Sequence, residues 1–146
     1  MSKYFYFFIL FFAWSCTPGS NNATYLSLSD ADKAKFDKYM ILGKEVYNTT
    51  CVNCHQIDGK GLHGLIPPLA DSDYLQNNQS KIPCLLHKGS IDSLIVNGRN
   101  YPPQMPAHTI SNLELAEVVT YINNTWGNEY GFMPVKEVDS LLNNCD

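Results

Sequence analysis

The sequence is poor in positive charge and in long apolar runs. Its 146 residues carry ten Lys and Arg against fourteen Asp and Glu, a formal charge of −4, and the cations form no cluster. Because nucleic-acid surfaces need such a cluster, we predict no nucleic-acid partner. The run Tyr4–Trp14 has eleven residues, short of the roughly 20 that a membrane-spanning helix needs. No internal repeat is present, so the length indicates one domain with additions.

The first residues match an export signal. Lys3 supplies a positive charge ahead of the apolar run, whose length suits a signal peptide, so we predict one over residues 1–15. Ala13-Trp14-Ser15-Cys16 resembles a bacterial lipoprotein box, with Trp14 where smaller residues are usual. Residues 16–28 are then expected to be a polar tether from a lipidated Cys16, which anchors the exported, periplasmic protein to a membrane. Cleavage by an ordinary signal peptidase is the alternative.

The most specific motif is Cys51-Val52-Asn53-Cys54-His55. Two cysteines three apart, followed at once by histidine, are typical of c-type haem attachment. Each thiol can add to one vinyl group of the porphyrin, and the imidazole of His55 can then ligate the iron. A thioredoxin-type redox pair needs no histidine here. Half of a zinc site would need a second C-x-x-C or an H-x-x-x-H, and neither follows. We therefore predict one haem c per chain.

A sixth iron ligand has to come from a distant segment. Met105 lies in the proline-stiffened stretch Tyr101–Pro106, and its thioether is soft enough to hold iron and raise its potential. Met40 and Met133 are interpreted as core residues. We predict Met105 as the ligand and leave an open site as the alternative, together with three rival histidines: His63, His87 and His108.

Other residues are predicted to support the haem. The glycine-rich loop after His55 ends in Pro67-Pro68, and a rigid prolyl carbonyl at Pro67 can accept a hydrogen bond from the His55 ring. Arg99 and Tyr101 are possible hydrogen-bond donors to a haem propionate. An exposed hairpin arginine is the alternative for Arg99.

Helix signals frame this motif on both sides. Ser29 can cap a helix that ends near Thr49 or Thr50, with Gly43 in its apolar face. Ser111 begins a second helix, expected to close at Gly127, whose Tyr121 or Ile122 should meet Gly43. Between and after them we predict short helices from Ser72 and over Ile82–Lys88, a hairpin over Leu94–Tyr101 turning at Asn97-Gly98, and a final helix containing Val135, Val138, Leu141 and Leu142.

Two cysteines remain unassigned, Cys84 and Cys145. In an oxidising compartment such a pair invites a disulfide that would tie the C-terminal tail to the domain. Two separate buried thiols are the alternative, because the sequence does not bring the two residues together.

Taken together, the motifs resemble the monohaem class I cytochromes c over about residues 31–126. The resemblance rests on Gly43-x-x-x-Tyr47, Cys51-x-x-Cys54-His55, Pro67-x-Leu69, Met105-Pro106 and a helix bearing Tyr121. It implies an all-α cytochrome c fold, with three to five helices around one covalent haem and a small hairpin before the methionine loop. It also implies axial ligation by His55 and Met105. The domain is expected over residues 29–127, with residues 128–146 as an extension packed against it.

The function that follows is single-electron transfer without catalysis. We expect redox partner proteins, either a membrane respiratory complex or a periplasmic reductase, and no small-molecule substrate. The alternatives are a haem enzyme or gas sensor with an open or labile sixth position, or a haem subunit of an oxidase or reductase. Occupancy of the sixth site separates a carrier from an enzyme or sensor.

Overall fold

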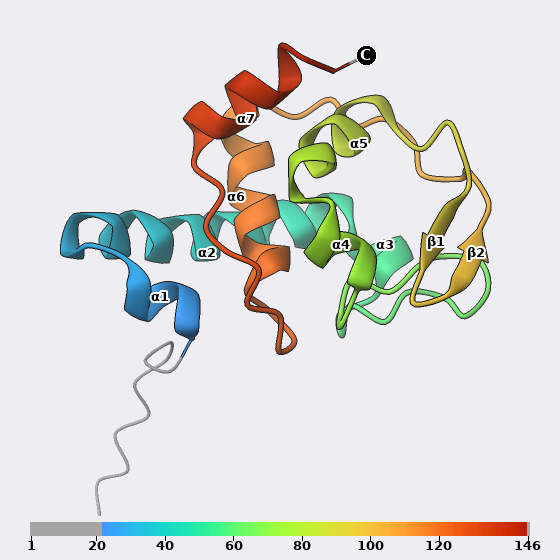
Figure 1. Cartoon of the computed structure of the whole chain (residues 1–146), viewed down its shortest axis with the longest axis horizontal. Coiled ribbons are helices and arrows are strands. Elements are labelled where there is room, and N and C mark those ends of the chain that lie inside the picture. Colours follow the sequence, from blue (N-terminus) through green and yellow to red (C-terminus); the bar gives the residue numbers. More distant parts are fainter. Residues whose placement is uncertain (1–21, 146) are drawn as a thin grey trace, which may run out of the picture.

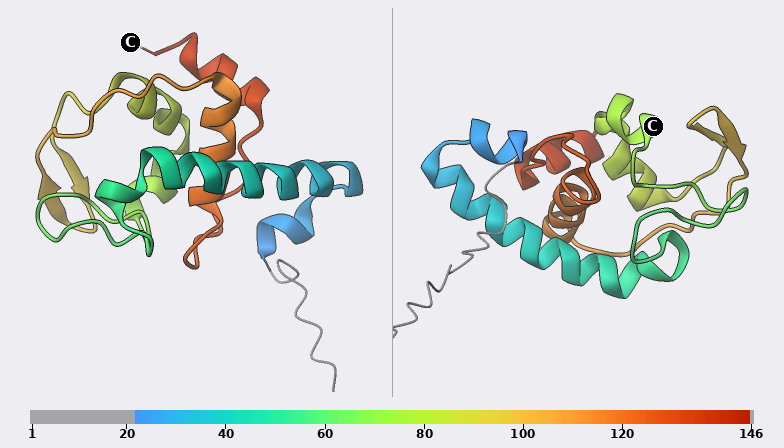
Figure 2. Two further views of the ribbon diagram at one scale, coloured as in Figure 1. Left: turned by 180° about the vertical axis from the view of Figure 1, so that it is seen from behind. Right: turned by 90° about the horizontal axis from the view of Figure 1, so that it is seen from below.

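Two crossing helices form the frame of the domain (Figures 1 and 2). The computed structural model describes residues 22–145, and in it α2 (Asp30–Thr50) packs across α6 (Asn112–Asn123). Ser29 caps α2 by accepting a hydrogen bond from the Asp32 N–H. Ser111 and Glu114 form a reciprocal capping box at the start of α6. Both helices therefore begin where the capping signals predict.

The crossing depends on the absence of a side chain at Gly43. A Cβ at this position would lie 2.6 Å from the Glu117 carbonyl carbon and 2.8 Å from the Tyr121 Cβ. Such contacts are far below van der Waals distance, so only glycine lets the two backbones approach this closely. Tyr121 is confirmed as the partner of Gly43. The core around this crossing consists chiefly of Tyr39, Tyr47, Leu115, Val118, Val119 and Ile122.

The remaining elements surround a space beside α2 and α6. The predicted all-α class with one small hairpin is confirmed. The described residues form seven α-helices rather than three to five, because several are only four or five residues long. The further elements are α3 (Val52–His55), α4 (Asp73–Asn77), the 3₁₀ turn η1 (Gln79–Lys81), α5 (Ile82–Lys88), and strands β1 (Leu94–Val96) and β2 (Arg99–Tyr101), paired antiparallel with Leu94 opposite Tyr101.

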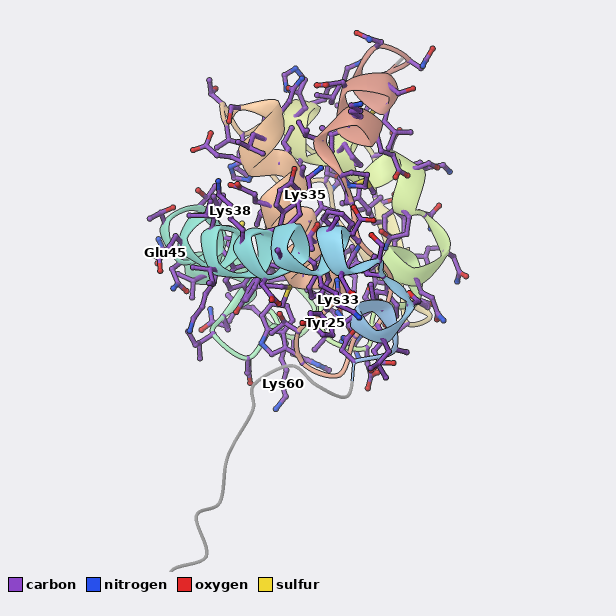
Figure 3. All side chains as sticks on the ribbon, turned by 90° about the vertical axis from the view of Figure 1, so that its left-hand side faces the viewer. Tyr25, Lys33, Lys35, Lys38, Glu45 and Lys60 are labelled. Atoms are coloured by element: carbon purple, nitrogen blue, oxygen red, sulfur yellow. A yellow bond between two sulfur atoms is a disulfide. The ribbon has the colours of Figure 1, made fainter. Side chains whose placement is uncertain are left out.

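The expected polar tether contains a short helix, α1 (Ala23–Ser27), capped by the Asn22 side chain. The Tyr25 ring packs edge-on against Phe36, 5.8 Å between centroids, and the Lys33 ammonium lies 5.8 Å from the Tyr25 ring (Figure 3). These aromatic contacts hold this part of the tether against α2. The predicted signal peptide and Cys16 lie outside the described residues. Within residues 22–145, no helix has the length and apolarity needed to cross a bilayer.

The C-terminal end of α6 differs from the prediction. The helix ends at Asn123 rather than near Gly127, because the Asn124 side chain donates to the Thr120 and Gly131 carbonyls and the chain turns. The following segment leads into α7 (Val135–Leu142), which lies against α5 and α6 and buries Val138 (Figure 1). A disulfide joins Cys84 to Cys145, so the predicted bridge ties the tail to α5.

Candidate cofactor site

Two adjoining cavities lie between α3, α4, α5, α6 and the hairpin. Apolar side chains from α4, α5 and α6 form one wall of the first cavity. The residues that line both are Cys51, His55, Pro67, Leu94 and Met105. The fold thus brings together the predicted attachment motif, the predicted sixth ligand and the prolyl carbonyl.

His55 ends α3 and is buried, with 8% of its surface exposed. Its Nδ1 lies 3.1 Å from the Pro67 carbonyl oxygen. A carbonyl only accepts, so Nδ1 carries the hydrogen and Nε2 keeps a free lone pair. Burial lowers the pKa of His55, which keeps the ring neutral. A neutral imidazole with a free Nε2 is the form that ligates a metal.

The two motif cysteines differ in exposure. Cys51 is half-buried and lines both cavities, whereas Cys54 is exposed and lines only the second. Burial, aided by the neighbouring Cys54, raises the pKa of Cys51 to about 11. Before a haem is attached, burial therefore favours the neutral thiol of Cys51. Both cysteines are free, so the pair remains available for covalent attachment.

Tight backbone contacts shape the loop that follows His55. The Gly61 N–H donates to the His55 carbonyl at 3.0 Å, and a Cβ on Gly61 would lie 2.6 Å from the Pro67 oxygen. Gly61 has φ +64°, a conformation that favours glycine. A Cβ on Gly59 would overlap the ring of Trp126, whose indole N–H donates to the Ile57 carbonyl at 3.1 Å. Contacts with Pro67 at one end of the loop and with Trp126 at Gly59 therefore leave its backbone little room to move.

Met105 competes with three histidines for the sixth position. It lines both cavities, and its carbonyl accepts a hydrogen bond from the Ser90 N–H at 2.9 Å. His108 lines the second cavity only, and His87 is exposed on α5. His63 is exposed and accepts a hydrogen bond from Arg99. The geometry favours Met105, with His108 as the rival that shares a cavity with it.

The two predicted propionate donors occupy different places. Tyr101 is buried, with 5% of its surface exposed, and lines the second cavity. Arg99 is exposed, is absent from the lining of both cavities, and has its Nη1 2.9 Å from the His63 Nε2. The structure therefore groups Tyr101 with the site and places Arg99 outside the cavities.

Three further residues support the site without having been singled out for it in the sequence. Trp126 covers the loop at Gly59, and Gly89 lies so close to the Met105 loop that a Cβ would be 2.7 Å from the Met105 oxygen. Asn128 is buried and hydrogen-bonds the segment after Pro67. Gly89 carries a sequence signal, since it closes a helix, but its contact with a loop sixteen residues away does not follow from that signal.

This set of side chains fits a covalently held haem. Two free thiols and an imidazole oriented through Nδ1 stand on one segment, and a thioether lines the same cavities. Apolar walls supply the dry surroundings that a porphyrin needs, with Leu75, Leu86, Val118 and Ile122 among them. His55 and Met105 would hold the iron, and Cys51 and Cys54 would hold the porphyrin.

Comparison with known proteins agrees with this chemistry. The family model described as cytochrome c matches residues 40–126. The cytochrome c subunit of a quinone alcohol dehydrogenase from Gluconacetobacter polyoxogenes is 28% identical over 119 residues, which cover 77% of this chain and 24% of the relative. The subunit of the same name from Gluconobacter oxydans is 28% identical over 96 residues, covering 59% of this chain and 18% of the relative.

The chain thus spans about a quarter or less of the length of these relatives. The family model covers more than half of the chain and contains the attachment motif and the methionine loop. The chain belongs to the cytochrome c family, and it is an electron-transfer component with covalently bound haem c rather than an enzyme.

Proposed function

We propose that this protein is a single-electron carrier with one haem, attached through Cys51 and Cys54 and ligated by His55 and Met105. The observation that supports the proposal most directly is the shared lining of the two cavities, which brings Cys51, His55 and Met105 together beside apolar walls, with Cys54 in the lining of the second cavity. When bound, the haem supplies an iron that gains and loses one electron. No catalytic side chain is required for that exchange.

The chain's own residues would control how readily the electron moves. His55, whose Nδ1–H donates to the Pro67 carbonyl, would hold the iron through a fixed and more basic Nε2. Met105 would close the other side with a soft ligand that raises the potential. Apolar walls from α5 and α6 exclude water, which reduces the reorganisation that accompanies a change of charge.

We also propose export and membrane attachment. The apolar run before Cys16 and the lipoprotein-like box support a periplasmic protein anchored through that cysteine. Its partners would be a membrane respiratory complex or a periplasmic reductase. Labelling of the protein with radioactive palmitate in cells tests the anchor. The parent should be labelled and Cys16→Ala should not, whereas equal labelling would overturn the anchor.

A second candidate is a haem subunit of a larger dehydrogenase. The similarity to cytochrome c subunits of quinone alcohol dehydrogenases favours it, at 28% identity. In that case the electron would come from a partner subunit of the same complex. Purification of the tagged protein from solubilised membranes distinguishes the two. A stoichiometric dehydrogenase partner supports the subunit, and a haem protein alone supports the free carrier.

The axial ligands can be tested by redox titration of the holoprotein followed by its absorption spectrum. The parent should show one reversible one-electron transition. Met105→Ala should lower the potential, because the thioether that stabilises reduced iron is lost. Met40→Ala is the matched control, since Met40 lies on α2 and is absent from the lining of both cavities. Equal potentials in parent and Met105→Ala would overturn ligation by Met105, and His108→Ala would then test the rival.

A further inference from the structure

Asn128 is a buried polar residue beyond the part of the chain that the family model matches. Only 1% of its surface is exposed, and each of its side-chain polar atoms has a partner. Its Nδ2 donates to the Ile122 carbonyl at 2.8 Å and to the Leu69 carbonyl at 2.9 Å. Its Oδ1 accepts from the Asp71 N–H at 3.0 Å. Asn128 thus joins the end of α6 to the segment that follows Pro67.

The segment held by Asn128 is fixed on its other side by the attachment loop. The Leu69 N–H and the Ala70 N–H both donate to the Gly59 carbonyl, at 2.7 and 3.0 Å. Asp71 has φ +52°, a conformation that is costly for a residue with a side chain. Hydrogen bonds from its N–H to Asn128 and from Asn97 to its carbonyl maintain it. Loss of the Asn128 side chain would remove the bonds that the Ile122 and Leu69 carbonyls and the Asp71 N–H make with it.

This segment carries the carbonyl that orients His55. Pro67 lies two residues before Leu69, and its oxygen is 3.1 Å from His55 Nδ1. A hydrogen bond of this kind raises the basicity of the ligating nitrogen, which stabilises the oxidised iron. A displacement of the segment by a few tenths of an ångström lengthens the bond and weakens this effect. The reduction potential should therefore depend on the position of the Pro67 carbonyl.

We propose that Asn128 is a positioning residue for the His55 imidazole, acting through Leu69 and the Pro67 carbonyl. The proposal rests on the proposed function in one respect, namely that His55 ligates the iron. In this account the C-terminal extension beyond residue 126 holds one of the determinants of the potential.

The test compares two buried asparagines in the holoprotein. Asn123 is also 1% exposed and lies on α6, but its side chain exchanges hydrogen bonds with Gln79 rather than with the loop. Asn128→Ala and Asn123→Ala should both lower the unfolding midpoint, because each leaves buried groups unpaired. Only Asn128→Ala should raise the reduction potential and shift the NMR resonance of the His55 ring N–H.

Two outcomes would overturn the proposal: a parental potential and ring N–H resonance in folded Asn128→Ala, or equal changes in both variants. If Asn128→Ala does not fold, Asn128→Ser, which keeps a hydroxyl, takes its place with the same readouts. Failure of the proposed function is visible separately. His55→Ala with the parental absorption spectrum would exclude His55 as the ligand, whatever Asn128 does.

Discussion

The two sides of the cofactor cavity are held in different ways. On the His55 side, Tyr47 and Trp126 donate to the carbonyls of Gln56 and Ile57, and the Gly59 carbonyl accepts two further N–H groups. On the Met105 side, the loop runs through exposed prolines, and backbone bonds to Ser90 and Leu86 attach it to α5. The loop on the first side is thus hydrogen-bonded to Tyr47 and Trp126 of the core cluster, whereas the methionine loop is attached to the end of α5 by two backbone bonds. We infer that the fold fixes His55 more firmly than Met105, so that of the two proposed ligands Met105 would be the more easily displaced.

The largest expected effect is on the His55 side. Gly61→Ala places a Cβ against the Pro67 carbonyl at φ +64°, and we expect it to lower the unfolding free energy by about 3 kcal/mol or more. Gly127→Ala is the matched control, with φ +89° and no atom within 4 Å of the added Cβ. It should cost only about 1–2 kcal/mol. Chemical denaturation measures both, and equal losses would show that the loop is not tightly packed.

A second prediction removes a constraint outside both ligand loops. Replacing Cys84 and Cys145 by serine opens a link between residues 61 positions apart. We expect a loss of about 2–4 kcal/mol in unfolding free energy, because the unfolded chain gains freedom. The absorption spectrum of the holoprotein should not change, since neither cysteine lines a cavity. A changed spectrum would mean that α7 helps to hold the Met105 side in place.

A glycine-to-alanine substitution on the Met105 side should cost less stability than Gly61→Ala and should change the spectrum. Gly89→Ala would bring a Cβ within 2.7 Å of the Met105 carbonyl oxygen. The methionine loop can move away, so we expect the unfolding free energy to fall by about 1–3 kcal/mol. The spectrum should show partial loss of methionine ligation. Gly98→Ala, at φ +72° with open space around it, is the control. An unchanged spectrum in Gly89→Ala would contradict the inference that Met105 is displaced more easily than His55.

The smallest effect concerns the scaffold that both sides share. Glu117 lies on α6 at the crossing with α2, is buried, and has an Oε1 without a hydrogen-bond partner among the described residues. Burial raises the pKa of Glu117. Between the ordinary and the raised pKa, only the folded protein holds the proton, so stability should fall as the pH rises through that window. Thermal unfolding at pH 5 and pH 7 should show a smaller difference for Glu117→Gln than for the parent.

Local signals in the sequence predicted much of this architecture. The capping residues Ser29 and Ser111 located the two long helices, and Gly43 indicated a close crossing. The Asn97-Gly98 pair located the hairpin turn, where both residues have positive φ. These features depend on residues close in sequence, so a pattern can reveal them. The sequence did not predict the helix at Ala23–Ser27, because the packing of Tyr25 on Phe36 that holds it against α2 is a tertiary contact without a local pattern.

The supporting residues of the site were less predictable. Met105 and Pro67 stand in proline-rich loops, which a sequence can flag. Asn128 bonds Leu69 and Asp71 across 59 and 57 residues of chain, and Trp126 bonds Ile57 across 69. No local pattern encodes such distant contacts. Arg99 illustrates the converse, since a donor type near the site bonds His63 instead. The direction of the Arg99 side chain, which residue type alone does not reveal, places its guanidinium outside the cavities.

The central proposal is that His55 and Met105 both ligate the haem iron, which leaves no position for an added ligand. It is tested most directly by the absorption spectrum of the reduced holoprotein, recorded before and after addition of carbon monoxide. If Met105 occupies the sixth position, carbon monoxide should leave the spectrum unchanged. A prompt and complete spectral shift would mean an open sixth position, and it would contradict the closed electron carrier described here.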